Sequence, residues 1–361
     1  MKKKKLLIAT GMFATGTVLT KLARLVNHGS KYNLNYLRTV SSINKDNLKF
    51  EKDEDGFYSI INESGKDLKI LQFADIHIGG GFLSRHEDRL AMKTIEEITR
   101  KTKPDLIVLN GDLVCSRPQV SFSRNNMNSI VQLTMMMERM GIPYAVTFGN
   151  KDSTTYSTHS RDALRKYLMK QNNCLMAWDG DYISGSSNYL IKVRNSKREI
   201  TNVLYFLDSN SYVRHGRKSL DFVHADQVKW YEKQVLRIMN SEGRNVPSVL
   251  FTHIPMEEFS KAWKLYVSGD ASVKYLYGKV NETISKPSVS STLFDKLRRL
   301  GSTKAVICAH DHLNNFSVIY KGIRLTCGKS MDYILYGKNV SGHRGGTLIY
   351  FSPDGNVITK G

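Results

Sequence analysis

The sequence predicts a layered α/β fold in which a second sheet closes a sandwich. Five short apolar runs, rich in Ile, Leu and Val, have the length and composition of buried strands. Amphipathic stretches with apolar residues near helical spacing lie between these runs, and this alternation is typical of an α/β domain. Three more strand-like runs follow near the C-terminus and indicate the second sheet: residues 316–320, 323–326 and 347–351.

The expected elements alternate along the chain. An edge strand is expected at residues 56–61. The five buried strands are expected at residues 68–73, 105–109, 143–148, 246–251 and 304–308. Helices are expected at residues 85–101, 121–140 and 226–239. Residues 261–287 lack a strong periodic signal, and a long irregular segment of this kind is often a lid over a substrate.

A side chain that can bind a metal ion follows each of the five buried strands. The segments are Asp75-Ile76-His77, Gly111-Asp112, Gly149-Asn150-Lys151-Asp152, His253 and His310-Asp311-His312. Ligands of open α/β sheets gather beyond the carboxyl ends of the strands, so these side chains should converge. Two metal ions about 3.5–4 Å apart need a bridging carboxylate together with neutral imidazole or amide ligands. Asp112 suits the bridge, and the set predicts a two-metal hydrolytic site.

These five segments, in this order, resemble the signature of the calcineurin-like metallophosphoesterases, which is D-x-H, G-D, G-N-H-D/E, a lone His after a strand, and G-H-x-H. Residues 205–209, 251–255 and 336–338 resemble the small purple-acid-phosphatase-related branch of that family. The resemblance covers about residues 67–351. It implies two mixed β-sheets packed face to face, with helices outside.

The resemblance also implies a role for each matching residue. Asp75, His77 and His312 resemble the ligands of a first metal, Asn150, His253 and His310 those of a second, and Asp112 the bridge between them. The implied cofactor is a pair of metal ions drawn from iron, manganese and zinc. The implied reaction is attack of a metal-bound hydroxide on a phosphate ester, and we favour monoesters over diesters.

Two positions depart from the family pattern. Cys115 stands where purple acid phosphatases have the tyrosinate that colours their iron, so no purple absorption band is expected. Lys151 stands where the family has its catalytic His, and we place Lys151 and the adjoining Asp152 among the catalytic residues. A lysine with its usual pKa near 10.4 is a poor proton donor at neutral pH, but it can hold a phosphoryl oxygen by charge. The alternative is that His86 or His159 supplies the acid.

The N-terminal segment differs in character from the rest of the chain. Four lysines at residues 2–5 precede a moderately apolar stretch at residues 6–19, which is the pattern of a secretory signal. We therefore expect a signal peptide or membrane anchor at residues 1–28, a tether with the edge strand at 29–66, and the catalytic domain at 67–361. The protein is expected to be secreted or anchored on the extracytoplasmic side. A basic tail on a cytoplasmic protein is the less favoured alternative.

The composition favours an anionic partner. The chain has 53 Lys and Arg residues against 33 Asp and Glu, a formal net charge of +20. The electrostatic field of this positive charge attracts anionic phosphorylated substrates and acidic membrane surfaces. The sequence has no motif for specific nucleic-acid binding. The four Cys residues lie in or beside apolar runs, so buried free thiols are as well supported as disulfides.

The sequence thus predicts a dinuclear metal-dependent phosphoesterase. The alternative is a metal-containing protein that binds a phosphate ligand and whose catalysis is weakened or lost through Lys151.

Overall fold

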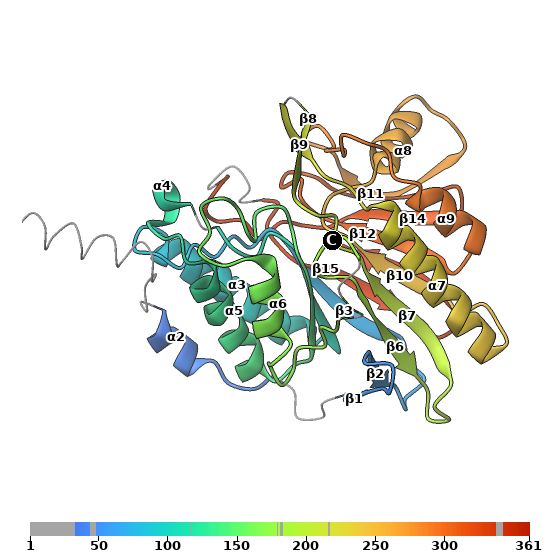
Figure 1. Cartoon of the computed structure of the whole chain (residues 1–361), viewed down its shortest axis with the longest axis horizontal. Helices are drawn as coiled ribbons and strands as arrows, with labels where there is room; N and C mark the ends of the chain where they lie inside the picture. The colour runs from blue at the N-terminus through green and yellow to red at the C-terminus, as the bar shows by residue number, and fades with distance from the viewer. Residues whose placement is uncertain are drawn as a thin grey trace, which may run out of the picture.

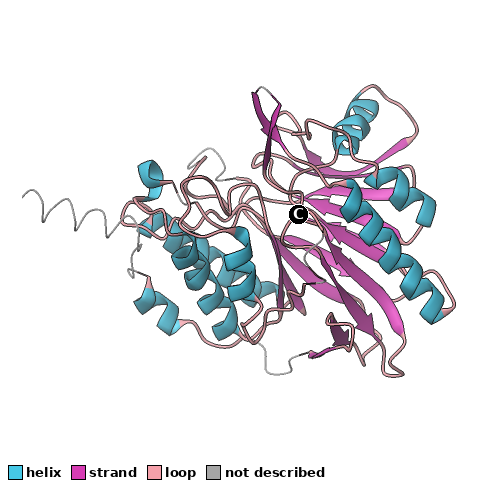
Figure 2. Ribbon diagram, viewed as in Figure 1, coloured by secondary structure: helices cyan, strands magenta, loops and turns pink. Residues whose placement is uncertain are grey.

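Two large mixed β-sheets face each other in the computed structural model, with helices on the outside of the sandwich (Figures 1 and 2). The structure describes residues 33–43, 48–115, 117–178, 180, 183–215, 217–336 and 342–361. The layered α/β architecture expected from the sequence is therefore confirmed.

The first sheet has five strands in the order β16 (Val357–Lys360), β15 (Thr347–Phe351), β3 (Leu68–Phe73), β4 (Leu106–Asn110) and β5 (Tyr144–Thr147). β3, β4 and β5 are parallel, so their carboxyl ends lie at one edge of the sheet. α2 (Leu34–Thr39), α3 (Arg85–Thr102), α4 (Pro118–Ser121), α5 (Asn126–Met140) and α6 (Arg161–Leu168) lie on this side of the molecule (Figure 1).

The second sheet has nine strands in the order β1 (Lys49–Lys52), β2 (Tyr58–Ile61), β6 (Tyr189–Arg194), β7 (Ile200–Phe206), β10 (Ser248–Phe251), β12 (Thr303–Cys308), β14 (Ile323–Cys327), β13 (Asn315–Tyr320) and β11 (Val273–Lys279). β7, β10, β12 and β14 run parallel to one another. α7 (Ala225–Glu242), α8 (Glu257–Val267) and α9 (Leu293–Leu300) lie on the other side of the molecule (Figure 1).

Local sequence explains why these segments take these forms. β4, whose residues are all buried, has apolar residues on both faces, because a parallel strand inside a sandwich contacts packed layers on either side. α5 begins where the side chain of Asn125 accepts the N–H of Asn128, and it ends at Gly141 in the left-handed conformation. In the second sheet Tyr189 stacks on Phe206, with ring centroids 4.6 Å apart.

Three expectations need correction. The strand at residues 58–61 is not an edge strand, because β1 pairs outside it. The C-terminal strands form no sheet of their own: β13 and β14 join the nine-stranded sheet and β15 joins β3. Residues 261–287 are not irregular, since they include most of α8 and all of β11, and their role as a lid stays a prediction. For the two corrections of strand order, the local pattern leaves open which strand would become the partner.

The segment expected to be a tether packs against the domain. Leu37 of α2 and Phe57 are buried, and α2 contacts α5. The expected signal peptide or anchor, residues 1–28, lies outside the described residues. Within the described part of the chain, no helix combines the length and the apolar character needed to cross a bilayer. The four cysteines are buried free thiols.

Packing of α2 leads to a first prediction. Leu37→Ala should lower the free energy of unfolding by about 2–5 kcal/mol, because it leaves a cavity between α2 and the core. Asn35→Ala, an exposed position on the same helix, should change it by no more than about 0.5 kcal/mol. Urea unfolding of the full chain measures both values. Equal free energies of unfolding for the two variants would show that residues 33–43 do not pack against the domain.

Candidate metal centre

The expected metal-binding residues meet where strands of the two sheets end. The loops after β3 and β4 continue to pair beyond the strands, since Asp75 N–H donates to Gly111 O over 3.0 Å and His77 N–H donates to Asp112 O over 3.1 Å. Asp75, His77 and Asp112 have φ values of 51°, 54° and 49°, and His310 after β12 has 78°. Such left-handed backbone costs roughly 1–3 kcal/mol at a non-glycine residue and often clusters at functional sites.

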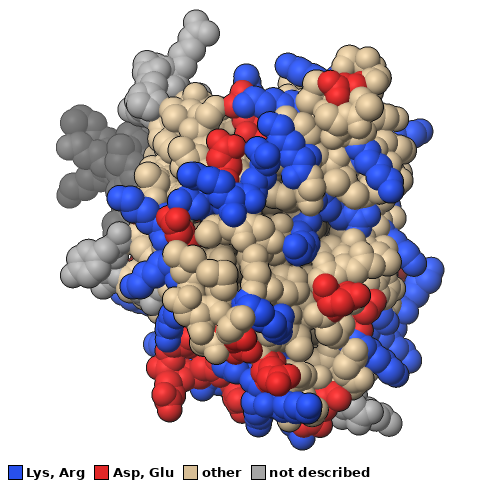
Figure 3. Space-filling model, turned by 90° about the vertical axis from the view of Figure 1, so that its right-hand side faces the viewer, with Lys and Arg blue, Asp and Glu red and all other residues tan. Residues whose placement is uncertain are grey.

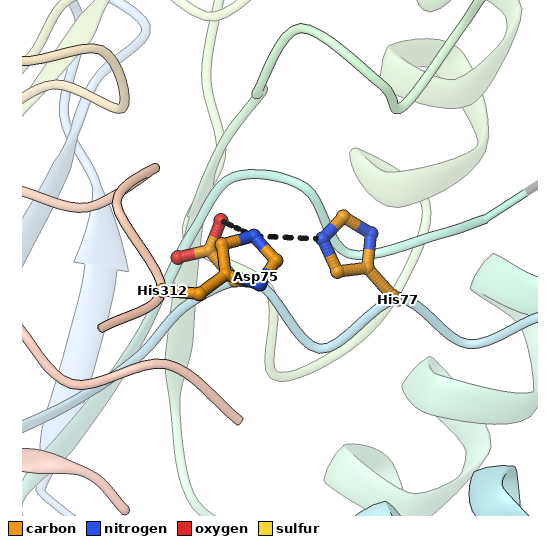
Figure 4. Close-up of side chains that lie close together, drawn as sticks. All are labelled: Asp75, His77 and His312. Carbon is orange, nitrogen blue, oxygen red and sulfur yellow. Dashed lines mark hydrogen bonds and ion pairs between the residues drawn. The ribbon is translucent and has the colours of Figure 1, made fainter. Parts of the chain in front are cut away.

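A first group of potential metal ligands consists of Asp75, His77 and His312 (Figure 4). The Nε2 atoms of the two histidines face each other 3.4 Å apart, and His312 Nε2 lies 3.5 Å from Asp75 Oδ1. All three side chains are buried, and Asp75 Oδ1 has no hydrogen-bond partner among the described residues. A buried carboxylate oxygen beside two imidazoles is a typical arrangement around a metal ion.

A second group consists of Asp112, His253 and His310. His253 Nε2 lies 3.4 Å from Asp112 Oδ2, and 3.3 Å from His310 Nδ1. Asp112 Oδ2 is also 4.0 Å from His77 Nε2 of the first group. One carboxylate oxygen thus lies between the two groups, which is the geometry that a bridging ligand requires.

A buried amide, that of Asn150, lies in the loop that contacts the second group, since the next residue, Lys151, donates its backbone N–H to Asp112 Oδ1. Asn150 Nδ2 donates to the Tyr212 hydroxyl at 2.5 Å, and Asn150 Oδ1 is buried without a hydrogen-bond partner among the described residues. A buried amide oxygen without a partner is costly unless a cation or water satisfies it. The carboxylate and imidazole donors of the two groups therefore suit two metal ions, and Asn150 stays a predicted ligand of the second.

Burial and neighbouring charges set the protonation of the histidines. Burial, with Lys151 nearby, lowers the pKa of His77 to about 4, and burial, with His253 nearby, lowers the pKa of His310 to about 3. Both imidazoles are therefore neutral at pH 7, the form that binds metals. Burial also opposes protonation of His253, but Asp112 and Asp75 outweigh it and raise its pKa to about 9.

Two acceptors orient the imidazoles. His253 Nδ1 lies 2.9 Å from the carbonyl oxygen of Asn110, and His312 Nδ1 lies 3.0 Å from Asp332 Oδ2. An N–H donated from Nδ1 leaves Nε2 free to bind a metal ion. Asp332 also accepts the backbone N–H groups of residues 334–336. The sequence analysis missed Asp332; its signal was an acidic residue shortly after β14.

Asp152 needs correction as a catalytic residue. Its Oδ1 accepts the backbone N–H groups of Leu113 and Val114, and its Oδ2 accepts those of Asp112 and Gly149. The carboxylate is buried and its oxygens are occupied by these four donors, so it faces neither group of potential ligands. Asp152 is a positioning residue that fixes two loops.

Two glycines and an arginine allow the loops to come this close. A Cβ on Gly149 would lie 2.3 Å from Asp112 N, and one on Gly111 would lie 2.5 Å from His253 Nδ1. Arg161 donates to the carbonyl oxygen of Gly149 and forms a 2.7 Å ion pair with Asp208. The sequence analysis did not identify Arg161, which lies in the first turn of α6 and carries no motif.

Lys151 lies against the candidate bridge. Its Nζ is 3.1 Å from Asp112 Oδ2, and its backbone N–H donates to Asp112 Oδ1. Burial works against its charge, but Asp112 and Asp75 outweigh burial and raise the pKa of Lys151 above its usual value. His86 is exposed and His159 contacts Thr158, so the structure places Lys151 rather than either histidine beside Asp112. Neither group of potential ligands includes the buried Cys115.

Comparison with known proteins agrees with this fold. A family model described as calcineurin-like phosphoesterase matches residues 68–314. A dimetal phosphatase from Danio rerio has a similar fold, with a TM-score of 0.52 and 12% identity over 82% of this chain and 96% of that one.

Curated relatives match most of the chain. "Probable inactive purple acid phosphatase 14" of Arabidopsis thaliana is 28% identical over 77% of this chain and 73% of its own length. "Probable inactive purple acid phosphatase 29" of the same plant is 27% identical over 75% of this chain and 74% of its own length. "Phosphatase DCR2" of Saccharomyces cerevisiae is 26% identical over 70% of this chain and 45% of its own length. With the family model covering most of its length, this chain belongs to the calcineurin-like phosphoesterase family.

Proposed function

We propose that the protein is a dinuclear metal-dependent phosphoesterase that hydrolyses phosphate monoesters. The observation that carries this proposal is the position of Asp112 Oδ2 between two groups of potential ligand atoms. When bound, the metal pair would supply Lewis acidity for activating water and the phosphoryl group. Iron, manganese and zinc all suit a site of imidazole, carboxylate and amide ligands.

The chain's own residues supply orientation and charge. Asp332 and the carbonyl of Asn110 fix two imidazoles, so that Nε2 of each is directed into the site. Lys151 provides an ammonium group beside Asp112 that can donate a charge-assisted hydrogen bond to a phosphoryl oxygen. Lys151 therefore acts as an electrostatic clamp in this proposal.

The proposal includes a location outside the cytoplasm. It rests on the basic and apolar pattern of residues 2–19, which lies outside the described residues. Secretion and anchoring to the extracytoplasmic side of a membrane are both consistent with that pattern.

A second candidate function is binding of a phosphate ligand without efficient turnover. Two observations favour it: Lys151 replaces the family's histidine, and two relatives are named inactive purple acid phosphatases. Both candidates share the metal site and differ in whether the phosphate ester is cleaved.

Measuring ester hydrolysis distinguishes the proposed phosphoesterase from the phosphate-binding protein. The full chain reconstituted with Mn²⁺ should hydrolyse para-nitrophenyl phosphate, and Asp112→Asn should abolish this turnover, because the amide removes the charge of the bridge. Asp354→Asn is a matched control, since it lies in the turn after β15 at the opposite end of the sheet from the site. Tight phosphate binding without turnover in the parent would instead favour the binding protein.

The clamp makes a separate prediction. Lys151→Ala should lower kcat/KM for an alkyl phosphate about 10²- to 10³-fold, as loss of an oxyanion donor does in other enzymes. Lys151→His should raise the activity on alkyl relative to aryl phosphates by about 10², because an imidazole can protonate a poor leaving group. Steady-state kinetics on both substrates measures these values. Unchanged alkyl phosphate activity in Lys151→Ala would exclude the clamp.

The role of Asp332 can be tested without turnover. Asp332→Asn should weaken Mn²⁺ binding about 10- to 100-fold, because it removes the charge that holds His312. Calorimetric titration of the metal-free protein measures this affinity, with Asp354→Asn as the control. An affinity equal to that of the parent would mean that His312 is not a metal ligand or does not need this partner.

A further inference from the structure

An exposed aromatic side chain lies directly against the candidate metal centre. The ring of Tyr336, in the loop after β14, packs on the imidazole of His312, with ring centroids 4.5 Å apart and ring planes inclined by 37°. Tyr336 is 36% exposed, whereas His312 is buried. One side of the phenol ring therefore contacts a predicted metal ligand, and part of the ring surface is open to solvent beside it.

Hydrogen bonds hold Tyr336 at both ends. Its backbone N–H donates to Asp332 Oδ2 over 2.7 Å, and the same oxygen lies 3.0 Å from His312 Nδ1. Its hydroxyl donates to Glu282 Oε2 over 3.3 Å, and Glu282 Oε1 accepts the backbone N–H of Leu313, the residue after His312, over 2.7 Å. The ring is thus tied to the loop that carries His312. A side chain that is already held in place loses little conformational freedom when a ligand binds to it.

The charge of Lys151 reaches the phenol. Burial and the neighbouring Glu282 raise the pKa of Tyr336, and the positive charge of Lys151 opposes this shift. The ammonium group and the phenol are therefore close enough to interact electrostatically. A phosphate group held by Lys151 at the metal ions would have its ester group near the ring of Tyr336.

A phenol ring at this position favours a flat partner. Aromatic rings attract each other in offset-stacked or edge-to-face arrangements with centroids about 4.5–7 Å apart. Beyond the burial of apolar area, such a pair tightens binding about 2- to 10-fold. A saturated ring of the same size buries similar apolar surface but lacks this interaction.

We propose that Tyr336 is a specificity-determining residue that contacts the ester group of the substrate, and that the preferred substrates are aryl phosphates, in which one oxygen joins the phosphate to an aromatic ring. The inference rests on the proposed function and names its substrate class. The phosphate lies at the metal ions beside Lys151, and the aromatic ring of the ester packs on the exposed part of the phenol.

Reaction rates and overall charge do not isolate this contact. Aryl phosphates are also cleaved faster than alkyl phosphates because their leaving groups need less help from an acid. The chain carries a net charge of +20, and Lys and Arg are spread over the face shown in Figure 3, so any anion is attracted. The contact must therefore be tested with ligands that are not cleaved and that carry the same charge.

A matched pair of phosphonates meets both conditions. Benzylphosphonate and cyclohexylmethylphosphonate carry the same phosphonate group and a ring of the same size at the same distance from phosphorus, and their P–C bond resists hydrolysis. Calorimetric titration of the full, Mn²⁺-loaded protein should give about 2- to 10-fold tighter binding of benzylphosphonate. Tyr336→Phe should keep this preference, because the aromatic ring remains, and Tyr336→Leu should abolish it.

Tyr350→Leu is the matched control. It makes the same substitution at a partly exposed tyrosine of β15, which pairs with Lys69 near the start of β3, away from the end of β3 that leads to the site. It should keep the preference for benzylphosphonate.

Three results would overturn the contact. The first is equal affinity of the parent for the two phosphonates. The second is an equal loss of affinity for both phosphonates in Tyr336→Leu, because the ring would then only hold His312 in place. The third is loss of the preference in Tyr336→Phe or in Tyr350→Leu.

The titration does not depend on catalysis. If benzylphosphonate is preferred through Tyr336 and no ester is hydrolysed, the contact stands and the proposed hydrolysis fails. If esters are hydrolysed and the two phosphonates bind equally well, hydrolysis stands and the contact fails.

Discussion

The candidate metal centre depends on a buried carboxylate whose two oxygens accept backbone N–H groups. Asp152 accepts four N–H groups, from Asp112, Leu113, Val114 and Gly149. Each of these donors would cost about 1–3 kcal/mol if it were left buried without a partner. By satisfying them together, Asp152 holds the loop after β4 against the loop after β5. Asp112 can then lie between both groups of ligand atoms only because residue 149 has no Cβ.

The same closeness explains the backbone strain at the site. Asp75, His77, Asp112 and His310 adopt left-handed conformations that an unconstrained loop would avoid. Each follows a buried strand by two to four residues, so the rigid sheets fix where the loop begins. Hydrogen bonds between the loops, such as that from His310 N–H to Asp75 Oδ2, then fix where it turns. Packing of the two sheets and the hydrogen bonds between the loops therefore offset the cost of the left-handed backbone at these residues.

The difference between local strand signals and contacts distant in sequence explains which features the sequence predicted and which it did not. Buried strands have a local signature, so β3 and β12 and the polar residues after them were found. Pairing depends on residues far apart in the chain, so the inner position of β2 and the sheet joined by β15 were missed. Asp332 and Arg161 were missed for the same reason. Each acts through a partner loop, and neither stands in a motif that local sequence marks as functional.

Compared with the family's histidine, Lys151 mainly changes the net charge of the candidate site. Two divalent ions would bring four positive charges to Asp75 and Asp112, and a neutral histidine at position 151 would leave that sum unchanged. A lysine adds one further charge, 3.1 Å from Asp112 Oδ2. This charge attracts a phosphate dianion before and after cleavage as well as in the transition state, so part of its contribution is uniform binding, which tightens affinity without raising kcat. Lysine also holds its proton at neutral pH, so it adds attraction without the acid that a poor leaving group needs. In the proposed phosphoesterase, the replacement therefore favours firm binding of phosphate and faster cleavage of activated esters than of alkyl ones.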